Sequence, residues 1–302
     1  MSTTPSASVA GAAFPAPRAV LELLKPVTWF PPMWAFLCGV VSSGEAVLPQ
    51  LGFLLLGILL TGPLVCATSQ AVNDWFDRHV DAINEPGRPI PSGRVPGRWG
   101  LWIGVIWSVL SLLVALALGP VVVAASVLGL ALAWAYSAPP IRLKRNGWWG
   151  NAAVGACYEG LPWITGAAVM LGGMLPDGRI LLLAALYSVG AHGIMTLNDF
   201  KAIDGDTALG VRTLPVRLGA ARAARFACLV MAAAQVAVVV CLALWGAWPH
   251  AAVIAAALAL QGFAMRRLLS DPEAHAPWYN QTGVSLYVLG MLVSAFALRG
   301  VV

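Results

Sequence analysis

Long apolar runs recur along the whole chain and set the first expectation about its structure. Apolar runs of 18 or more residues are typical of transmembrane helices, and the short alternating segments of a membrane β-barrel are absent. The pattern predicts an all-α polytopic membrane protein with nine transmembrane helices in a bundle around a central cavity. The expected spans lie near residues 28–44, 51–72, 99–118, 120–137, 150–171, 180–198, 223–245, 250–268 and 281–298.

The composition supports a membrane protein and excludes a soluble one. Apolar residues make up 59% of the chain and charged residues only 10%, whereas about 25% of the residues in a soluble domain are charged. The mean hydropathy is +0.80. The net charge of +5 comes without a soluble basic domain, so it indicates membrane topology and anionic lipids rather than nucleic acid.

The N-terminal residues do not resemble a signal peptide. They are small and interrupted by prolines, with no basic region before an apolar core and a cleavage site. We expect residues 1–24 to be a flexible cytoplasmic tail that ends in an interfacial segment around Leu21–Lys25. Residues 25–302 would then form one domain.

Lys and Arg residues are distributed unevenly between the loops that these spans define. If the N-terminus is cytoplasmic, only Arg179 and Arg299 of the 18 basic residues fall on the opposite side. Basic loops stay in the cytoplasm during membrane insertion. The distribution therefore predicts a cytoplasmic N-terminus.

Acidic residues are concentrated at the end of the second expected span. Asn73, Asp74, Asp77 and Asp81 form the pattern N-D-x-x-D-x-x-x-D. If the helix continues, these side chains share one face, where carboxylates repel one another. A hard divalent cation relieves this repulsion, and Mg²⁺ takes oxygen ligands together with substrate phosphates. The stretch therefore predicts a Mg²⁺ site; the alternative is an ordinary charged helix end.

A second acidic stretch closes the sixth expected span on the same side. It reads N-D-F-K-A-I-D-G-D and contributes Asn198, Asp199 and Asp206 as candidate metal ligands, with Gly205 leaving helix continuity open. One acidic loop is common, but two of similar form suggest metal sites that face each other across a cavity. Two Mg²⁺ ions held in this way would clamp a diphosphate and draw off the leaving group.

Basic residues near both motifs are candidate ligands for that diphosphate. Arg88 and Arg94 occur in R-P-I-P-S-G-R, Lys144 follows the turn Y-S-A-P-P-I-R-L, and Lys201 lies inside the second motif. A diphosphate carries more charge than two metals neutralise locally, so Arg and Lys donors are expected nearby. The alternative is ordinary positive-inside charge, which we favour for Arg142.

Together these motifs resemble those of the UbiA-type intramembrane prenyltransferases. The resemblance rests on both acidic motifs, on Y-S-x-P-P-x-x-L-K and on the nine expected helices, and it covers residues 25–300. Within that superfamily, D-R-H-V-D-A-I-N-E-P, K-R-N-G-W-W-G and H-G-I-M-T-L-N-D-F-K-A are similar to chlorophyll and bacteriochlorophyll synthases. T-W-F-P-P-M-W-A-F-L-C-G and A-C-Y-E-G-L-P-W favour the bacterial branch. Ala202 stands where many relatives carry an acidic residue, which shifts ligation toward Asp206.

The resemblance implies Mg²⁺-dependent transfer of a C20 prenyl group, geranylgeranyl or phytyl, from its diphosphate to the propionate carboxylate of bacteriochlorophyllide. The alternatives are transfer to chlorophyllide, or a related enzyme with a quinone-precursor or haem acceptor. It further implies a bacterial inner membrane, contact with membrane lipids, and association with other pigment-synthesis or photosystem-assembly proteins. Because a propionate is ionised at neutral pH, we expect no indispensable general base.

The candidate residues then take expected roles. The expected catalytic residues are Asp74, Asp77, Asp199 and Lys144. The expected Mg²⁺ ligands are Asn73, Asp74, Asp77, Asp81, Asn198, Asp199 and Asp206. The expected diphosphate ligands are Arg88, Arg94, Tyr136, Ser137, Lys144 and Lys201.

Three residues inside the expected spans are candidate pigment contacts. An unpaired Glu159 facing lipid would cost at least about 2.5 kcal/mol, so we expect it to face the cavity, either in a helix-packing hydrogen bond or against the pigment. His192 lies two turns before Asp199, as a hydrogen-bonded histidine of the bundle or as a contact to the macrocycle. Trp163 is the third candidate.

Two other classes of function fit the sequence less well. A transporter tends to carry charges at the middle of the membrane, whereas the acidic residues here gather at one face. A structural pigment-binding protein would have no use for paired Asp motifs.

Overall fold

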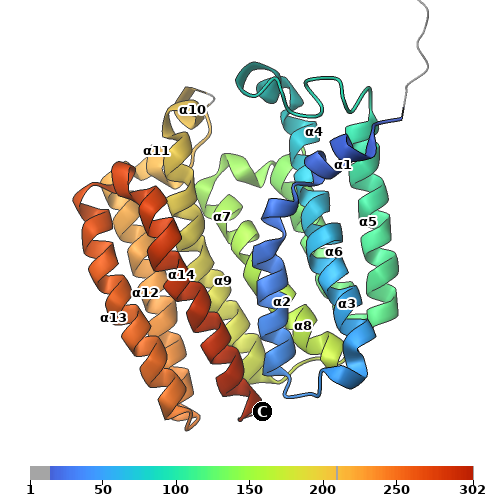
Figure 1. The fold of residues 1–302 in the computed structure, drawn as a ribbon. Helices are drawn as coiled ribbons and strands as arrows, with labels where there is room; N and C mark the ends of the chain where they lie inside the picture. The colour runs from blue at the N-terminus through green and yellow to red at the C-terminus, as the bar shows by residue number, and fades with distance from the viewer. Residues whose placement is uncertain (1–13, 209, 302) are drawn as a thin grey trace, which may run out of the picture.

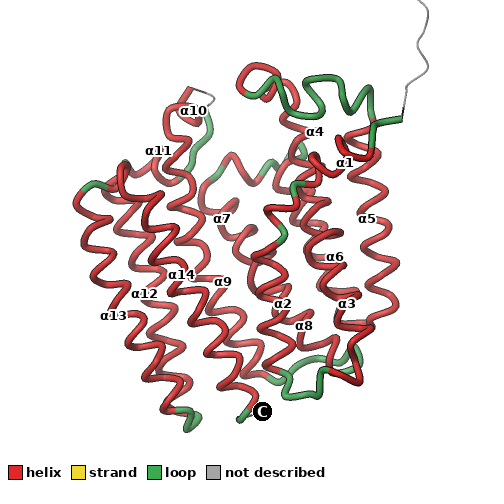
Figure 2. The backbone as a smooth tube through the Cα atoms, viewed as in Figure 1, coloured by secondary structure: helices red, strands yellow, loops and turns green. Residues whose placement is uncertain are grey.

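The computed structural model describes residues 14–208 and 210–301, and within these ranges the protein is helical with no β-strand (Figures 1 and 2). The α-helices are α1 (Pro17–Leu24), α2 (Phe30–Ser42), α3 (Leu51–Leu59), α4 (Ala67–Asn84), α5 (Trp99–Leu118), α6 (Pro120–Ser137), α7 (Gly147–Gly155), α8 (Leu161–Met170), α9 (Gly178–Asn198), α10 (Ile203–Ala208), α11 (Leu214–Leu218), α12 (Ala220–Leu244), α13 (Trp248–Ser270) and α14 (Pro272–Arg299). The all-α class expected from the apolar runs is confirmed.

Seven helical stretches of the described residues are long and apolar enough to cross a membrane. They are Leu48–Asn84, Trp99–Leu118, Pro120–Ser137, Gly178–Ala208, Ala220–Leu244, Trp248–Ser270 and Pro272–Arg299. The chain is therefore a multi-pass membrane protein.

The other two expected spans have a different form. Span 28–44 corresponds to α2, which has 13 residues and is shorter than the roughly 17 residues of a typical crossing. Span 150–171 corresponds to α7 and α8, joined by a π-helical segment at Ala156–Gly160. The number of nine spans therefore stays a prediction.

Two π-helical segments lie within the bundle. Leu60–Cys66 contains Pro63 and joins α3 to α4, whereas Ala156–Gly160 precedes Pro162. Proline lacks the N–H that an α-helix needs, and local π turns let the backbone be satisfied around it. The helix of the second span therefore continues through Pro63 into the first acidic motif.

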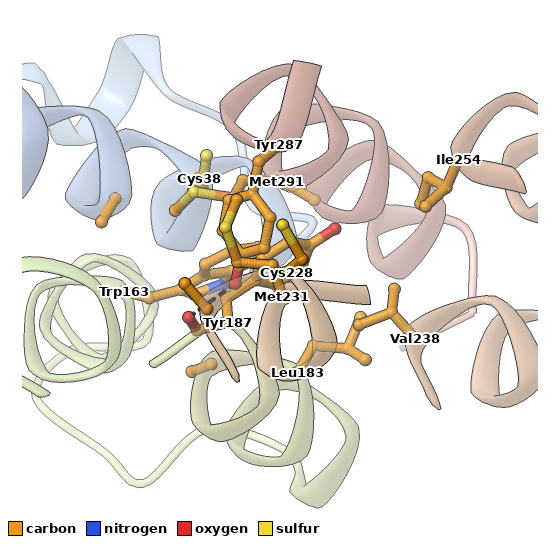
Figure 3. Close-up of a cluster of buried hydrophobic side chains, with 14 of the residues drawn as sticks. Cys38, Trp163, Leu183, Tyr187, Cys228, Met231, Val238, Ile254, Tyr287 and Met291 are labelled. Carbon is orange, nitrogen blue, oxygen red and sulfur yellow. Dashed lines mark hydrogen bonds between the residues drawn. The ribbon is translucent and has the colours of Figure 1, made fainter. Parts of the chain in front are cut away.

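Aromatic side chains hold the middle of the bundle together (Figure 3). Trp163 of α8 stacks on Tyr187 of α9 with the ring centroids 5.4 Å apart, and Tyr187 meets Tyr287 of α14 edge-on at 5.3 Å. The Tyr287 hydroxyl donates to the Tyr187 carbonyl oxygen at 2.7 Å, and the Trp163 indole N–H donates to Ser42 Oγ at 3.0 Å. These bonds satisfy the polar ends of the rings where water is excluded.

Two glycines let α2 and α8 approach backbone to backbone. A Cβ atom at Gly39 would lie 2.0 Å from the Trp163 carbonyl oxygen, and one at Gly166 would lie 2.0 Å from that of Phe36. Such contacts leave room for no side chain, as is common where membrane helices pack closely. The short helix α2 is thereby fixed against α8.

The expected N-terminal tail lies partly outside the described residues. Its last eight residues form α1, in which Leu23 and Leu24 are buried in a cluster with Ala67 and Ala71 of α4. This packing brings Lys25, which follows α1, close to the first acidic motif.

Both acidic motifs lie at the same end of the bundle. In Figure 1 the last turns of α4 and the short helices α1, α10 and α11 gather at the upper end, whereas the C-terminus lies at the lower end. The helices α7, α8 and α9 lie between the group α3–α6 and the group α12–α14.

Candidate functional site

A mostly apolar cavity of about 500 Å³ opens between α4, α6, α7, α8, α9 and α14. Asn73 and Asn198, the first residues of the two acidic motifs, both line it. Both π-helical segments contribute to its wall as well, through residues that include Cys66 and Tyr158. The two motifs that are distant in sequence therefore meet at one cavity.

Asp74 of the first motif is buried against cations. Only 1% of its surface is exposed. Its Oδ1 atom lies 2.6 Å from Lys25 Nζ and 3.4 Å from an Arg88 guanidinium nitrogen. Arg88 also binds Asp81 Oδ2 at 2.9 Å and Glu85 at 2.6 Å. The loop that follows α4 thus folds back so that one arginine joins two carboxylates of the motif.

Asp77 faces the loop after α6. Its carboxylate forms an ion pair with Lys144, and Arg142 lies 3.5 Å away. Burial lowers the pKa of Lys144 from its ordinary value, and the charge of Asp77 offsets part of that effect. The favoured interpretation of Arg142 as topological charge alone is therefore too narrow, because its guanidinium reaches the first motif.

Polar side chains extend from this cluster toward the cavity. The amide of Asn73 donates to Ser137 Oγ at 3.2 Å, and Tyr136 lines the cavity beside it. One turn deeper in α4, the Gln70 amide donates to the Tyr158 hydroxyl at 3.2 Å. Ser137 thus contacts the first motif and Tyr136 lines the cavity, and their role toward a diphosphate stays a prediction.

The second motif makes its contacts with amides. Asp199 Oδ2 accepts a hydrogen bond from Asn151 of α7 at 3.2 Å, and Asn198 Oδ1 accepts one from Asn280 of α14 at 2.8 Å. After α9 the chain continues as a 3₁₀ turn over Asp199–Ala202 and then as α10, which carries the half-buried Asp206. The helix is therefore tightened rather than broken between the two carboxylates.

The loops that carry the two halves of the site are joined by backbone hydrogen bonds. Gly147 N–H donates to the Arg212 carbonyl at 3.0 Å, and Arg212 N–H donates to the Arg145 carbonyl at 3.1 Å. The turn that holds Lys144 is thus tied to the chain that follows α10.

The profile of the UbiA prenyltransferase family matches residues 28–294, nearly the whole chain. The chain belongs to this family. It is 60% identical over 286 residues to the bacteriochlorophyll synthase 33 kDa chain of Cereibacter sphaeroides, across 95% of this chain and 94% of that protein. It is 38% identical to the chloroplastic chlorophyll synthase of Oryza sativa subsp. japonica, across 92% of this chain and 76% of that protein.

Solved structures of UbiA proteins share the fold. A structure of digeranylgeranylglyceryl phosphate synthase matches with a TM-score of 0.73 at 22% identity, covering 92% of this chain and 98% of that one. A UbiA homologue from Archaeoglobus fulgidus bound to GPP and Mg²⁺ matches with a TM-score of 0.63 at 19% identity, covering 94% and 100%. These likenesses establish the arrangement of the helices.

The oxygen atoms of this UbiA site fit a magnesium ion that is shared with a substrate. Among the described residues, no group of three or more His, Cys, Asp or Glu side chains is close enough to hold a metal alone. The donors are nevertheless all carboxylate and amide oxygens, the ligands that Mg²⁺ prefers. Asp74 Oδ2 is buried and has no hydrogen-bond partner among the described residues, so it retains capacity for a further ligand.

Two expected diphosphate ligands, unlike Arg88 and Lys144, form no ion pair with a described carboxylate of either acidic motif. Arg94 is exposed and binds Glu22 of α1 and the Gly87 carbonyl oxygen, so it ties α1 to the loop after α4. Lys201 is exposed and makes no ion pair with another described residue. Of the six expected diphosphate ligands, Tyr136 is the one that lines the cavity among the described residues. Their roles toward a diphosphate therefore remain predictions.

Sequence reasoning missed two residues of this site. Lys25 was assigned to an interfacial segment, although it binds Asp74. Asn151 received no role, although it binds Asp199. The available signals were the proline that follows Lys25 and the N-G-W-W-G-N stretch in which Asn151 sits, but neither indicates a partner so distant in sequence.

The three candidate pigment contacts differ in their position relative to the cavity. Glu159 lines the cavity. His192 does not line it; its Nε2 donates to the Trp148 carbonyl at 3.1 Å, and its ring packs on Trp148 and Phe226. Trp163 is fully buried in the aromatic core. The arrangement favours His192 as a hydrogen-bonded histidine of the bundle and leaves Trp163 without a surface that a pigment can reach.

Proposed function

We propose that the protein is a bacteriochlorophyll synthase, which transfers a C20 prenyl group from its diphosphate to the propionate of bacteriochlorophyllide and releases diphosphate. The observation that carries this proposal is 60% and 57% identity, over 95% of the chain, to two bacteriochlorophyll synthases. The lower identity of 38% to a chlorophyll synthase makes chlorophyllide the second candidate acceptor.

Residues of both motifs would hold Mg²⁺ together with the diphosphate. The proposed protein ligands are Asn73, Asp74, Asp77, Asp81, Asn198, Asp199 and Asp206. When bound, Mg²⁺ neutralises the negative charge that develops on the departing diphosphate. The solved UbiA homologue with GPP and Mg²⁺ supports this choice of metal.

Lys144 and Arg88 have a second task in this proposal. Both cations are paired with carboxylates of the first motif, Lys144 with Asp77 and Arg88 with Asp81. With those carboxylates engaged by Mg²⁺, the ammonium and guanidinium groups would be free to donate to phosphate oxygens. They hold the diphosphate against the mouth of the cavity, beside Tyr136 and Ser137.

The reaction then needs little further help from the chain. The allylic C–O bond breaks, its electron pair leaves with the diphosphate, and a propionate oxygen forms the new ester bond. The apolar cavity excludes water that would otherwise capture the allylic cation. Because the propionate is already ionised, no general base is required.

The proposal includes the placement of the chain in the membrane. We place it in a bacterial inner membrane with the N-terminus and both acidic motifs in the cytoplasm. In addition to the seven long apolar helices, α2 and the joined helices α7 and α8 would cross, which makes nine crossings. Residues 25–302 would form the catalytic domain.

A direct assay tests the proposal. Membranes that contain the purified protein are given bacteriochlorophyllide or chlorophyllide with geranylgeranyl or phytyl diphosphate, first with Mg²⁺ and then with EDTA. We expect esterified bacteriochlorophyllide in the presence of Mg²⁺ and none after chelation. Prenylation of a quinone precursor or a haem supplied in the same assay, with esterification of neither pigment, would overturn the assignment.

A further inference from the structure

Glu159 is a carboxylic acid inside an apolar cavity, and the chemistry proposed above gives it no task. It belongs to the π-helical segment Ala156–Gly160 and is only 7% exposed. Its Oε2 atom is buried and has no hydrogen-bond partner among the described residues. A buried polar atom without a partner costs about 1–3 kcal/mol, so the position calls for a ligand or a function.

Among the described residues that line the cavity, Glu159 is the one with a buried side-chain oxygen or nitrogen that has no hydrogen-bond partner. Thr61 and Thr165 donate to the carbonyl oxygens of Gly57 and Leu161 in their own helices. Gln70 and Tyr158 bind each other. The unfilled hydrogen-bonding capacity at Glu159 is thus a local feature and does not reflect a generally polar wall.

Glycines hold the segment that carries Glu159 firmly against α9. A Cβ atom at Gly155 would lie 2.6 Å from the Ser188 carbonyl oxygen, and one at Gly160 would lie 2.3 Å from Ser188 Oγ. These close approaches on both sides of Glu159 fix the backbone that carries it. Short π-helical turns of this kind are frequent at functional sites.

The surroundings of Glu159 set its protonation state. Among the described residues that line the cavity, none is Lys, Arg or His. An ionised carboxylate without a partner would cost several kcal/mol in such a place. The group is therefore held as the neutral acid, which offers one O–H donor.

The depth of Glu159 tells which substrate this donor meets. Glu159 follows Asn151, the partner of Asp199, by eight residues, or about 12 Å along a helix. At that depth a prenyl chain offers only hydrocarbon, because all its oxygen atoms lie in the diphosphate. A tetrapyrrole attached to its propionate arm spans such a distance and carries carbonyl oxygens at its rim.

We propose that Glu159 is a specificity residue that donates a hydrogen bond to a carbonyl oxygen on the ring of the pigment acceptor. This inference rests on the proposed function, since it needs a pigment in the cavity. It makes Glu159 a residue that selects and orients the acceptor, remote from the bonds that break and form.

Pigment binding without prenyl diphosphate tests the inference, using Glu159→Gln and Glu159→Leu in detergent. Glu159→Gln keeps a donor and should bind bacteriochlorophyllide within about threefold of the unmodified protein. Glu159→Leu should raise the dissociation constant about tenfold, the equivalent of one lost hydrogen bond. The KM for prenyl diphosphate should stay unchanged in both variants.

Pigment derivatives in which one ring carbonyl is replaced by CH₂ provide a matched chemical control. The derivative that lacks the carbonyl contacted by Glu159 should bind the unmodified protein about tenfold more weakly than the parent pigment does. The Glu159→Leu variant should bind this derivative and the parent pigment with equal affinity, because the hydrogen bond is already lost. This comparison stays informative even if Glu159→Leu fails to fold, because the unmodified protein alone must then discriminate between the derivatives.

Two outcomes overturn the inference. In one, no derivative discriminates; in the other, Glu159→Leu weakens prenyl diphosphate and not pigment. Failure of the proposed function looks different, because the unmodified protein would then esterify no pigment at all. If pigment is esterified but the loss caused by Glu159→Leu is the same for every derivative, the role of Glu159 is refuted and the proposed function stands.

Discussion

The two acidic motifs are similar in sequence, but their carboxylates have different partners. In the first motif Asp74 binds Lys25 and Asp77 binds Lys144. In the second motif the partner of Asp199 is the neutral amide of Asn151. One half of the site is therefore balanced by positive charge from the chain, and the other half is oriented by dipoles.

This difference suggests a division of labour between the halves. If the carboxylates of the first motif held a metal, their ammonium and guanidinium partners would be free to bind a diphosphate. At the second motif the carboxylate has no cation to give up, so the electrostatic gain on binding Mg²⁺ should be larger. We expect the first motif to govern diphosphate binding and turnover, and the second to govern the affinity for Mg²⁺.

The largest expected effect is loss of turnover when the first motif is changed at Asp77. Asp77→Asn should lower kcat at least about 10³-fold, or about 4 kcal/mol of transition-state stabilisation. Asp77 is more suitable than Asp74, because Asp74 is buried with its cations and its removal would also destabilise the fold.

Steady-state rates of purified protein in detergent measure this effect. The matched control is Asp204→Asn, since Asp204 is exposed on α10. Activity of Asp77→Asn within about tenfold of the unmodified protein would refute the role of the first motif.

A smaller effect is expected on the Mg²⁺ requirement when the second motif is changed. Asp199→Asn should raise the Mg²⁺ concentration for half-maximal activity about 100-fold, and Asn151→Ala about tenfold, because it only orients the carboxylate. Rates measured across a Mg²⁺ series provide the test. Equal shifts from Asp81→Asn and Asp199→Asn would show that the proposed division of labour between the motifs is wrong.

The pairing of Lys25 with Asp74 should be visible as stability in the absence of metal. Lys25→Met leaves the buried Asp74 carboxylate with fewer donors and should cost about 2 kcal/mol of unfolding free energy. Thermal unfolding in detergent without Mg²⁺ measures it, with the exposed Lys201→Met as the control. Addition of Mg²⁺ and diphosphate should narrow the difference in melting temperature between Lys25→Met and Lys201→Met. Identical melting temperatures for the two variants without metal would contradict the pairing of Lys25 with Asp74.

The smallest expected effect concerns the ion pair between Glu22 and Arg94, which ties α1 to the first half of the site. The hydrogen bond from Arg94 holds the pKa of Glu22 below its ordinary value of 4.5. A carboxyl whose pKa is lower in the folded state adds stability above its unfolded pKa and loses it as the pH falls through the folded pKa.

Glu22→Gln should therefore lower the melting temperature slightly at about pH 7 and not at all well below the folded pKa. Both partners are largely exposed, so the effect is modest and screened by salt. An equal loss at both pH values would mean that packing of α1, and not the charge of Glu22, is responsible.

Individual residues show which parts of the site could be read from the chain. Asp74, Asp77 and Asp81 were recognisable because helical spacing places them on one face. Lys144 was recognisable because it follows a proline-rich turn next to a span. The partners of Arg94 and Arg142 were harder to predict from the sequence, because a loop arginine can reach several side chains and only the folded loop determines which of them it binds.

The helical class, the multi-pass membrane character and the positions of both acidic motifs follow from the sequence, because apolar run length and helical periodicity are local properties. Tertiary structure alone decided that Lys25 meets Asp74, that Asn151 orients Asp199 and that His192 lies away from the cavity. These outcomes depend on how helices rotate and approach one another. Close contacts such as that of Gly39 with Trp163 set those rotations, and they join residues too far apart in the chain for any local pattern to reveal.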